Sequence, residues 1–494
     1  MEVLDKLEIK YLISYSFMQL IRLFKNILGP FGIYKNLQIN DEVIFMKDTL
    51  NIYKVLMTKN PILKLTSFSV SYFHSHFNDG LLRLIIFVSK IIVNSLFIMD
   101  DFFTSTTIIK ILKKCTAKSL EIINNAGVRA NEAHAKIKYN LIKTILQTKL
   151  DKDISAFISK ELVINFKKQF LAKKIKKSNK ISIIVLKNVA FSSIFFFNGL
   201  IISNNKRNIF FPKLLVNNLV FFSVGALSER LIKDFTNSPN ILMMNLKSHF
   251  HKSHYQYNRN KIIITDQKIH LSLQKKLIKE NIYLITECDK NQVLALKSYV
   301  TKTHQPKNKP LESNLPIIIK YFYELEFHGK RFFLMENKHY SLCLNIMLIA
   351  RTTFNLKILK SQLFTSLKIF SKLSDYTRIT YGSGFIELFI YKYLIRSLYK
   401  RELKYKRIIY CYLDSLFTIP KILLSNSYKL KKSIYFFKFI TLFYTKYGIN
   451  SLLCNFSLIN KLGILDLLDT TENIYCITYK IASELLNMES LIIC

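Results

Sequence analysis

The residues best suited to chemistry begin with a glycine-rich stretch near the start of the chain, KNILGPFGIYKN at residues 25–36. Gly29, Pro30 and Gly32 stand within four positions of a chain that has only 11 Gly and 8 Pro. Gly29 and Pro30 end a helix, and Gly32 permits a second unusual backbone angle. Exposed backbone N–H groups at a helix end, with no side chains in the way, can approach a phosphate closely. The stretch therefore predicts either a phosphate-binding turn or a plain helix terminator.

Seven further stretches follow along the chain, and their shared order extends over more than 400 residues. They are MKDTLNIYKVL (46–56), NPILKL (60–65), HFNDGLLRLIIFVSKII (76–92), RITYGSGFIELFIYKYL (378–394), DSLFTIPKILLSNSYKL (414–430), YGIN (447–450) and LGILDLLD (462–469). In this order and spacing the series resembles the group II chaperonins, most closely subunits of the eukaryotic cytosolic ring chaperonin, CCT. The segments NSYKL and GILDLLD resemble the theta subunit.

The resemblance is carried by matches to the family's motifs LGP-x-G, TNDGATIL, HPAAKLL, GDGTT, PGGGA-x-E, IP-x-x-LAEN-x-G and GI-x-(D/E). It covers most of the chain and is strongest over residues 10–125 and 350–490. Gly29, Gly32, Gly80, Gly382 and Gly384 are 5 of the 11 glycines, which indicates that a glycine-poor chain keeps glycine where the backbone needs it. The matching residues are Leu28-Gly29-Pro30-Phe31-Gly32, Asp48, Asn60-Pro61, Asn78-Asp79-Gly80, Gly382-Ser383-Gly384 with Glu387, Ile419-Pro420 through Asn426, and Gly463-Ile464-Leu465-Asp466.

The resemblance implies ATP and Mg²⁺ as cofactors. By it, Asp48 and an aspartate near position 375 position or activate the attacking water, and Asp79 holds Mg²⁺. These roles suit the chemistry, because hard carboxylate oxygens bind Mg²⁺ and a carboxylate can orient water. The catalytic residues implied are Asp48 and Asp375. The nucleotide-binding residues implied are Leu28, Gly29, Pro30, Gly32, Asn78, Asp79, Gly80, Leu81, Leu82, Gly382, Ser383, Gly384 and Asp466.

Several positions depart from the family's pattern. Leu81 and Leu82 replace the two threonines of GDGTT, so their phosphate-binding hydroxyls are gone. Thr49 replaces the glycine after Asp48, and the middle glycine of the triplet is Ser383. The family's second catalytic aspartate falls on residue 376, a tyrosine here, so Asp375 could serve only after a one-residue shift of the loop. We therefore expect weakened ATP binding and slow or absent hydrolysis, and Asp48 and Asp79 as solvated loop carboxylates are the alternative.

The elements that must position these residues change in character along the chain. Helical spacing of apolar residues predicts helices over 10–27, 50–70, 80–97 and 104–125, and again over 355–373, 384–400, 403–424 and 474–487. Between them, short apolar runs predict buried strands at 181–186, 240–246, 261–265, 282–286, 316–322 and 330–335, with a loop at 303–315. This order predicts a helical domain made from both chain ends, with an α/β domain inserted between them.

The resemblance implies the same architecture, an α+β multidomain chaperonin fold. It places an equatorial nucleotide-binding domain at 1–125 and 377–494, an intermediate domain at 126–198 and 338–376, and an apical substrate-binding domain at 199–337. The apical segment is shorter than the family's equivalent, which carries the protrusion that acts as a lid, so we expect a reduced apical domain. By the same resemblance, the chain would join paralogous subunits in a double ring that folds unfolded client proteins such as actin and tubulin.

The composition suggests another class of protein. The formal net charge is +40, from 73 Lys+Arg against 33 Asp+Glu, which is typical of nucleic-acid binders. Only 12 of these basic residues are Arg, whose planar group of donors binds phosphates and bases better than Lys does. The abundant Lys, Asn, Ile, Phe and Tyr all have AT-rich codons. We therefore favour drift in an AT-rich genome and do not expect a nucleic-acid partner. A basic RNA-associated protein of the ribosomal type is the alternative hypothesis.

Other features bear on compartment and on further sites. The 7 Cys form no C-x-x-C pair, which predicts buried free thiols in a reducing compartment, either cytoplasm or the remnant cytosol of a reduced endosymbiont. The apolar stretches at 81–103 and 184–203 contain Lys and Asn residues, so we interpret them as core and expect no membrane span. His249, His251 and His254 have no evident carboxylate or Cys partner and predict an exposed loop.

Overall fold

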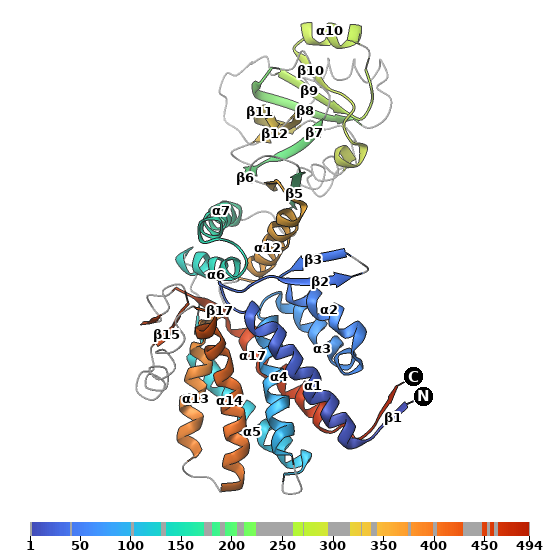
Figure 1. Ribbon diagram of the computed structural model, residues 1–494. Coiled ribbons are helices and arrows are strands. Elements are labelled where there is room, and N and C mark those ends of the chain that lie inside the picture. Colours follow the sequence, from blue (N-terminus) through green and yellow to red (C-terminus); the bar gives the residue numbers. More distant parts are fainter. Residues whose placement is uncertain are drawn as a thin grey trace, which may run out of the picture. The chain divides into compact units, whose positions relative to one another are not determined.

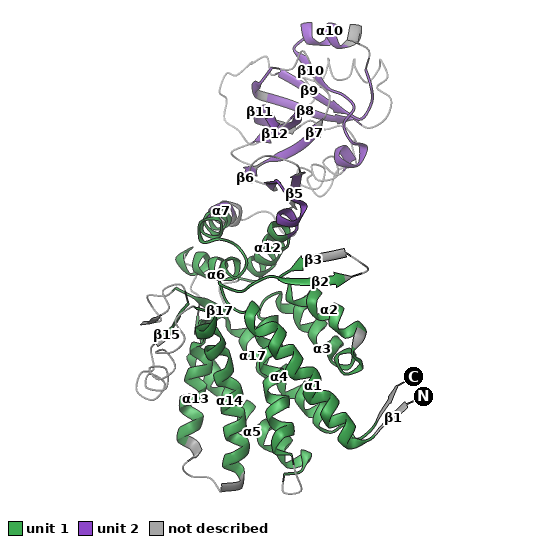
Figure 2. Ribbon diagram, in the orientation of Figure 1, with its two compact units in different colours: residues 1–163, 358–494 green, residues 164–357 purple. Residues whose placement is uncertain are grey.

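The computed structural model describes residues 2–39, 42–99, 103–129, 135–171, 180–187, 193–204, 212–223, 260–269, 271–294, 317–327, 329–336, 343–373, 377–398, 403–427, 447–451, 455–458 and 463–493. The chain forms two compact units. Unit 1 comprises residues 1–163 and 358–494, and unit 2 comprises residues 164–357 (Figure 2). Both chain ends therefore build one unit, with the middle of the chain inserted as the other. The finer division into equatorial, intermediate and apical domains stays a prediction.

Unit 1 is mainly helical, and its long helices lie roughly side by side (Figure 1). Its helices are α1 (Lys6–Phe24), a short 3-10 turn η1 (Lys25–Ile27), α2 (Thr49–Lys59), α3 (Pro61–Phe77), α4 (Leu81–Ile98), α5 (Ser105–Ala126), α6 (Ala135–Gln147), α13 (Phe385–Leu398), α14 (Leu403–Asn426) and α17 (Leu468–Leu486), while the unit boundaries fall within α7 (Lys152–Leu171) and α12 (Thr353–Lys372).

Helix α4 is the central helix of unit 1. It is apolar on nearly all sides, as expected of a helix surrounded by protein, and Leu84, Ile86 and Ile92 are fully buried. Helices α1, α14 and α17 pack around it. By length and composition, α4 and residues Tyr405–Asn426 of α14 could each cross a membrane, but α4 packs inside the hydrophobic core of unit 1. The prediction that residues 81–98 form core is therefore confirmed.

The entry to α4 is fixed by local backbone chemistry. Helix α3 begins at Pro61 and is capped by Asn60, whose side chain accepts hydrogen bonds from the N–H groups of Ile62 and Leu63. The same helix ends at Asn78 in the left-handed conformation. A second left-handed residue, Gly80, then starts α4. The predicted helix over 50–70 is thus two helices, because Asn60 and Pro61 end one and start the next.

Four small sheets complete unit 1 among the described residues. Strand β14 (Arg378–Tyr381) lies between β17 (Leu465–Leu467) and β4 (Val128–Arg129), which joins segments from both chain halves. Strands β1 (Glu2–Leu4) and β18 (Leu491–Ile493) pair antiparallel and bring the chain ends together. Strands β2 (Lys35–Ile39) and β3 (Glu42–Met46) form a hairpin, and a further pair is β15 (Tyr447–Asn450) with β16 (Asn455–Leu458).

Unit 2 is built on two sheets. The larger has the order β10-β9-β8-β11-β12-β7, in which β8, β9 and β10 are parallel and the remaining neighbours antiparallel. The smaller has the order β5-β13-β6. The elements are β5 (Lys180–Lys187), β6 (Ser193–Asn198), β7 (Leu200–Asn204), β8 (Leu214–Ser223), β9 (Asn260–Thr265), α10 (Leu271–Lys279), β10 (Ile282–Ile285), β11 (Ile317–Phe327), β12 (Lys330–Glu336) and β13 (Cys343–Ala350).

The expected strands are mostly present. The runs at 181–186, 261–265, 282–286, 316–322 and 330–335 correspond to β5, β9, β10, β11 and β12, whose apolar side chains fill the cores of unit 2. The run at 240–246, the loop at 303–315 and the three histidines at 249–254 lie outside the described residues. Cys115 and Cys288 are buried free thiols as expected, whereas Cys476 is an exposed free thiol, contrary to expectation.

Candidate nucleotide site

Most of the sequence-predicted site residues meet at one cavity of about 210 Å³ in unit 1. They come from segments that are up to several hundred positions apart in the sequence: the turn after α1, the start of α2, the α3–α4 turn, the β14–α13 turn and strand β17. The predicted residues that line this cavity are Leu28, Gly29, Asp48, Asn78, Asp79, Gly80, Leu81, Leu82, Ser383, Gly384 and Asp466.

The first wall is the glycine turn after η1. Gly29 has a φ of +89°, and a Cβ there would stand 3.2 Å from Leu423 Cδ2 in α14. Asn426, at the end of α14, donates its side-chain N–H to the carbonyls of Lys25 and Leu28, each at 2.8 Å. Two helices thus fix the turn, and Asn426 supports the cavity wall from behind.

Pro30 and Gly32 belong to this turn but do not line the cavity. The expectation of a second unusual angle at Gly32 is wrong, because its φ is not in the left-handed region. Glycine is required there for space, since a Cβ would stand 1.9 Å from the carbonyl oxygen of Ile27. The N–H of Gly32 donates to the carbonyl of Gly29, and this closes the turn.

The second wall is the α3–α4 turn. Asn78 and Gly80 have φ values of 58° and 79°, and together they aim the amino end of α4 at the cavity. At a helix start the first N–H groups, here those of Leu81 and Leu82, have no intrahelical acceptor and attract anions. The side chains of these two residues are apolar. This wall can therefore bind a phosphate through backbone N–H groups but not through side-chain hydroxyls.

Asp79 lies in the same turn, partly buried. Burial raises the pKa of its carboxyl group, and the negative charge of Asp466 raises it further. A hydrogen bond from the backbone N–H of Gly80 and the charges of Lys149 and Arg83 act in the opposite direction. The ionised Asp79 is therefore short of positive charge, which a bound cation would supply.

Asp466 is held by an arginine on α4. Arg83 pairs with Asp466 through Nη1 and Oδ2 at 2.8 Å, and with Glu387 of α13 through Nε and Oε1 at 2.6 Å. Glu387 is almost completely buried, and Arg83 is the cation that balances it. This three-residue network joins α4, α13 and β17 at the floor of the cavity.

The third wall is the glycine triplet before α13. Ser383 and Gly384 have φ values of +63° and +74°. The Ser383 hydroxyl donates to the carbonyl of Ile449 in β15, so it is engaged with the backbone. Gly382 does not line the cavity, but a Cβ there would stand 3.0 Å from Asp466 Oδ1. Gly382 therefore lets the backbone pass close to that carboxylate.

Asp48 caps the start of α2 without using its carboxylate for the cap. That carboxylate pairs with Lys149 through Oδ1 and Nζ at 3.3 Å. The other catalytic candidate, Asp375, lies outside the described residues, as does residue 376. Of the two implied catalytic carboxylates, the structure therefore places Asp48 at the cavity.

The cavity also holds residues that sequence reasoning missed. They include Lys47, His74 and Lys149, with Thr144 and Thr470. Burial lowers the pKa of His74, and Lys149 and Lys368 lower it further, while Asp48 opposes them. No local motif marks Thr144 and Lys149, which reach the cavity because α6 packs against β17. Lys47 lies directly before Asp48 in the stretch 46–56, and this position is the signal that could have identified it.

The donor set fits Mg²⁺ only in part. Among the described residues no cluster of three or more His, Cys, Asp or Glu side chains could hold a metal ion. Mg²⁺ is commonly bound by one or two carboxylates together with phosphates and water. Asp79 fits that pattern, because it is a lining carboxylate whose ionised form lacks positive charge. It would hold Mg²⁺ beside a phosphate.

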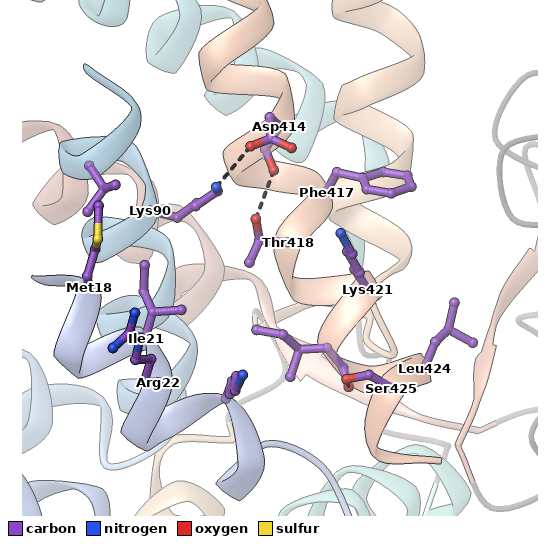
Figure 3. A pocket seen from close by; sticks show the side chains of 13 residues that line it. Met18, Ile21, Arg22, Lys90, Asp414, Phe417, Thr418, Lys421, Leu424 and Ser425 are labelled. Atoms are coloured by element: carbon purple, nitrogen blue, oxygen red, sulfur yellow. Dashed lines mark hydrogen bonds and ion pairs between the residues drawn. The ribbon is translucent and has the colours of Figure 1, made fainter. Parts of the chain in front are cut away.

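A second cavity, of about 480 Å³, lies between α1, α4 and α14 (Figure 3). Arg22, Lys25, Lys90 and Lys421 line it, with Asp414 paired to Lys90 at 3.2 Å. None of the sequence-predicted site residues lines it, and it has no glycine turn. It is therefore not the nucleotide candidate.

The fold and the cavity define a multidomain α+β protein with a glycine-walled, carboxylate-bearing pocket in a discontinuous helical unit. The model of the TCP-1/cpn60 chaperonin family matches residues 20–494, and the chain belongs to that family. No curated protein matches the sequence. Family membership establishes the chaperonin fold class and supports a chaperonin-type role in protein folding.

Proposed function

We propose that the chain is a subunit of an ATP-dependent chaperonin ring and that ATP binds in the cavity of unit 1. One observation carries this proposal: Gly29, Asp48, Asp79, Gly384 and Asp466 come from five separate segments and line one cavity. Backbone N–H groups at the start of α4 suit phosphates, and Asp79 suits the accompanying Mg²⁺.

The side chains that line this cavity are better suited to binding ATP than to hydrolysing it. Leu81 and Leu82 offer no hydroxyl, and Asp48 is paired with Lys149, so it must give up that ion pair before it can orient a water molecule. Asp466 pairs with Arg83, which also pairs with Glu387, so this carboxylate is held in place and is not free to orient a water molecule. We propose that ATP turnover is slow or absent in this subunit.

Assembly is supported by the two small sheets that involve the chain ends and the β2–β3 hairpin. Each has only two strands among the described residues, and an isolated two-stranded sheet is marginally stable in water. Their free edges can accept a strand of a neighbouring subunit. We propose a hetero-oligomeric double ring of paralogous subunits, of the cytosolic CCT type with this chain theta-like, that acts on unfolded clients such as actin and tubulin.

Two measurements test this function. The first is the native mass of the protein purified from its source, expected to be that of a double ring, many times the 58.1 kDa of one chain. The second is ATP binding to the full chain, expected to weaken when Asp79 is changed to Ala in the presence of Mg²⁺. A small native mass combined with no ATP binding would overturn the proposal.

The RNA-associated alternative has a separate signature. With a net charge of +40, some RNA binding at low salt is expected of any such chain. A dedicated RNA partner would give co-sedimentation with RNA that persists at physiological salt. We propose that binding is lost there, because the lysines lie mainly on solvated surfaces.

A further inference from the structure

Lys47 is a buried cation without a partner anion in the part of the chain that the structure describes. It stands between β3 and α2, is 9% exposed and lines the nucleotide cavity. It has no ion pair or hydrogen bond to any residue that the structure describes, and its Nζ lies 5.6 Å from the centre of the Tyr34 ring. Burying a charged ammonium without an opposite charge is expensive, so this position is stable only if the group is deprotonated or an anion arrives.

Burial and the charge of Lys149 act on Lys47 in the same direction. Burial has the larger effect, and together they lower the pKa of the Lys47 ammonium group to about 8. The adjacent Asp48 is neutralised by Lys149. The other ionisable groups near this end of the cavity are Tyr34, which lies close to Asp151; His74, whose pKa is lowered by burial and by Lys149 and Lys368; and Asp79. Among the described residues, none of these carboxylates forms an ion pair with Lys47.

We propose that Lys47 binds a phosphate group of the cavity's ligand and takes up a proton from solution as it does so. The neutral amine gains one proton, and the resulting ammonium donates hydrogen bonds to phosphate oxygens. This inference rests on the proposed function for the identity of the ligand, since the cavity is taken to be the nucleotide site. It assigns to Lys47 part of the phosphate binding that hydroxyls at positions 81 and 82 would otherwise provide.

The experiment is calorimetric titration of the full chain at pH 8 with ADP and, separately, with inorganic pyrophosphate. Each titration is run in two buffers of different ionisation enthalpy, which reports the protons taken up. The variants are Lys47→Met and Lys47→Arg, with Lys64→Met as the charge-matched control, because Lys64 is exposed on α3 and away from the cavity.

At pH 8, wild type is expected to take up about half a proton from solution at Lys47, since the pKa of the free side chain is about 8 and the bound ammonium is fully charged. Lys47→Met should lose this uptake and bind about tenfold or more weakly. Lys47→Arg should retain most of the affinity but take up correspondingly fewer protons, because arginine is always charged. Any proton change of the ligand itself is common to wild type and Lys47→Arg and cancels in their difference.

The outcomes separate this inference from the proposed function. ADP binding with the same affinity and proton uptake in wild type and Lys47→Met overturns the role of Lys47 and leaves nucleotide binding intact. Pyrophosphate binding that depends on Lys47, without ADP binding, supports the phosphate role and counts against the nucleotide. If neither ligand binds wild type, both proposals are wrong.

Discussion

Three residues with buried charges decide how the cavity responds to pH and to ligands. Lys47, Asp79 and Arg83 carry charges that burial penalises, and among them only Arg83 is well paired. Each of the three therefore yields a measurable response when its charge is removed, and the direction of that response differs from one residue to the next.

The first prediction concerns the stability of the ligand-free protein with Lys47→Met. At pH 7 the variant should be more stable than wild type, because the folded state no longer holds an unpaired ammonium. The pKa of Lys47 is about 8 in the folded state and has the ordinary value of 10.5 in the unfolded state. Between these two pH values the unfolded state therefore binds more protons than the folded state. The stability of wild type should therefore gain on the variant as pH rises from about 8 to about 10.5.

Chemical denaturation of wild type, Lys47→Met and Lys64→Met over this pH range measures the gap. The Lys64→Met control should follow wild type throughout, since its side chain is exposed. A gap between wild type and Lys47→Met that does not change with pH would show that Lys47 titrates normally.

A second prediction concerns Arg83. Arg83→Met should destabilise unit 1 by about 3–5 kcal/mol, because it leaves Glu387 charged and almost completely buried. The double variant Arg83→Met with Glu387→Leu should recover much of that loss, since both buried charges are gone. Thermal unfolding and urea titration measure the stability loss of each variant. Equal losses in the single and double variants would contradict a role of Arg83 in balancing the buried Glu387.

At the scale of elements, the cavity is formed by turns whose shapes depend on neighbouring helices. Asn426→Ala removes the donor that serves the carbonyls of Lys25 and Leu28. We expect a loss of about 1–3 kcal/mol, and faster amide hydrogen exchange in residues 28–33 than in α4. Asn473→Ala is the matched control, because its side chain donates to a single carbonyl on the exposed side of α17.

The sequence predicts elements well where one local rule governs them. The apolar pattern of residues 80–97 and the turn formers Asn60 and Pro61 lead to α4 and to the start of α3. Contacts between residues that come together only in the folded chain are not predicted in this way. Gly32 is needed because of the Ile27 carbonyl rather than for its own φ, and Lys149 reaches Asp48 across the cavity. Neither relation leaves a local signal, because each depends on how helices pack.

At the scale of the whole molecule, the proposed ring assembly can be tested at the chain ends. Strand β18 pairs with β1, and this ribbon has no third strand among the described residues. Deleting residues 491–494 should convert a ring-sized species into single chains on a sizing column, while circular dichroism stays close to that of wild type. A truncated chain that still elutes as a ring would show that the ribbon is not an interface.

The three-stranded sheet β17-β14-β4 has a consequence for how the protein is made. The sheet joins residues 128–129, 378–381 and 465–467, so one wall of the cavity exists only after nearly the whole chain has been synthesised. Unit 2 is continuous in sequence and can fold on the ribosome, whereas residues 1–163 must wait for residues 358–494. A growing chain therefore exposes its unfinished helical half longest, and the cavity proposed to bind ATP is incomplete until the end of synthesis.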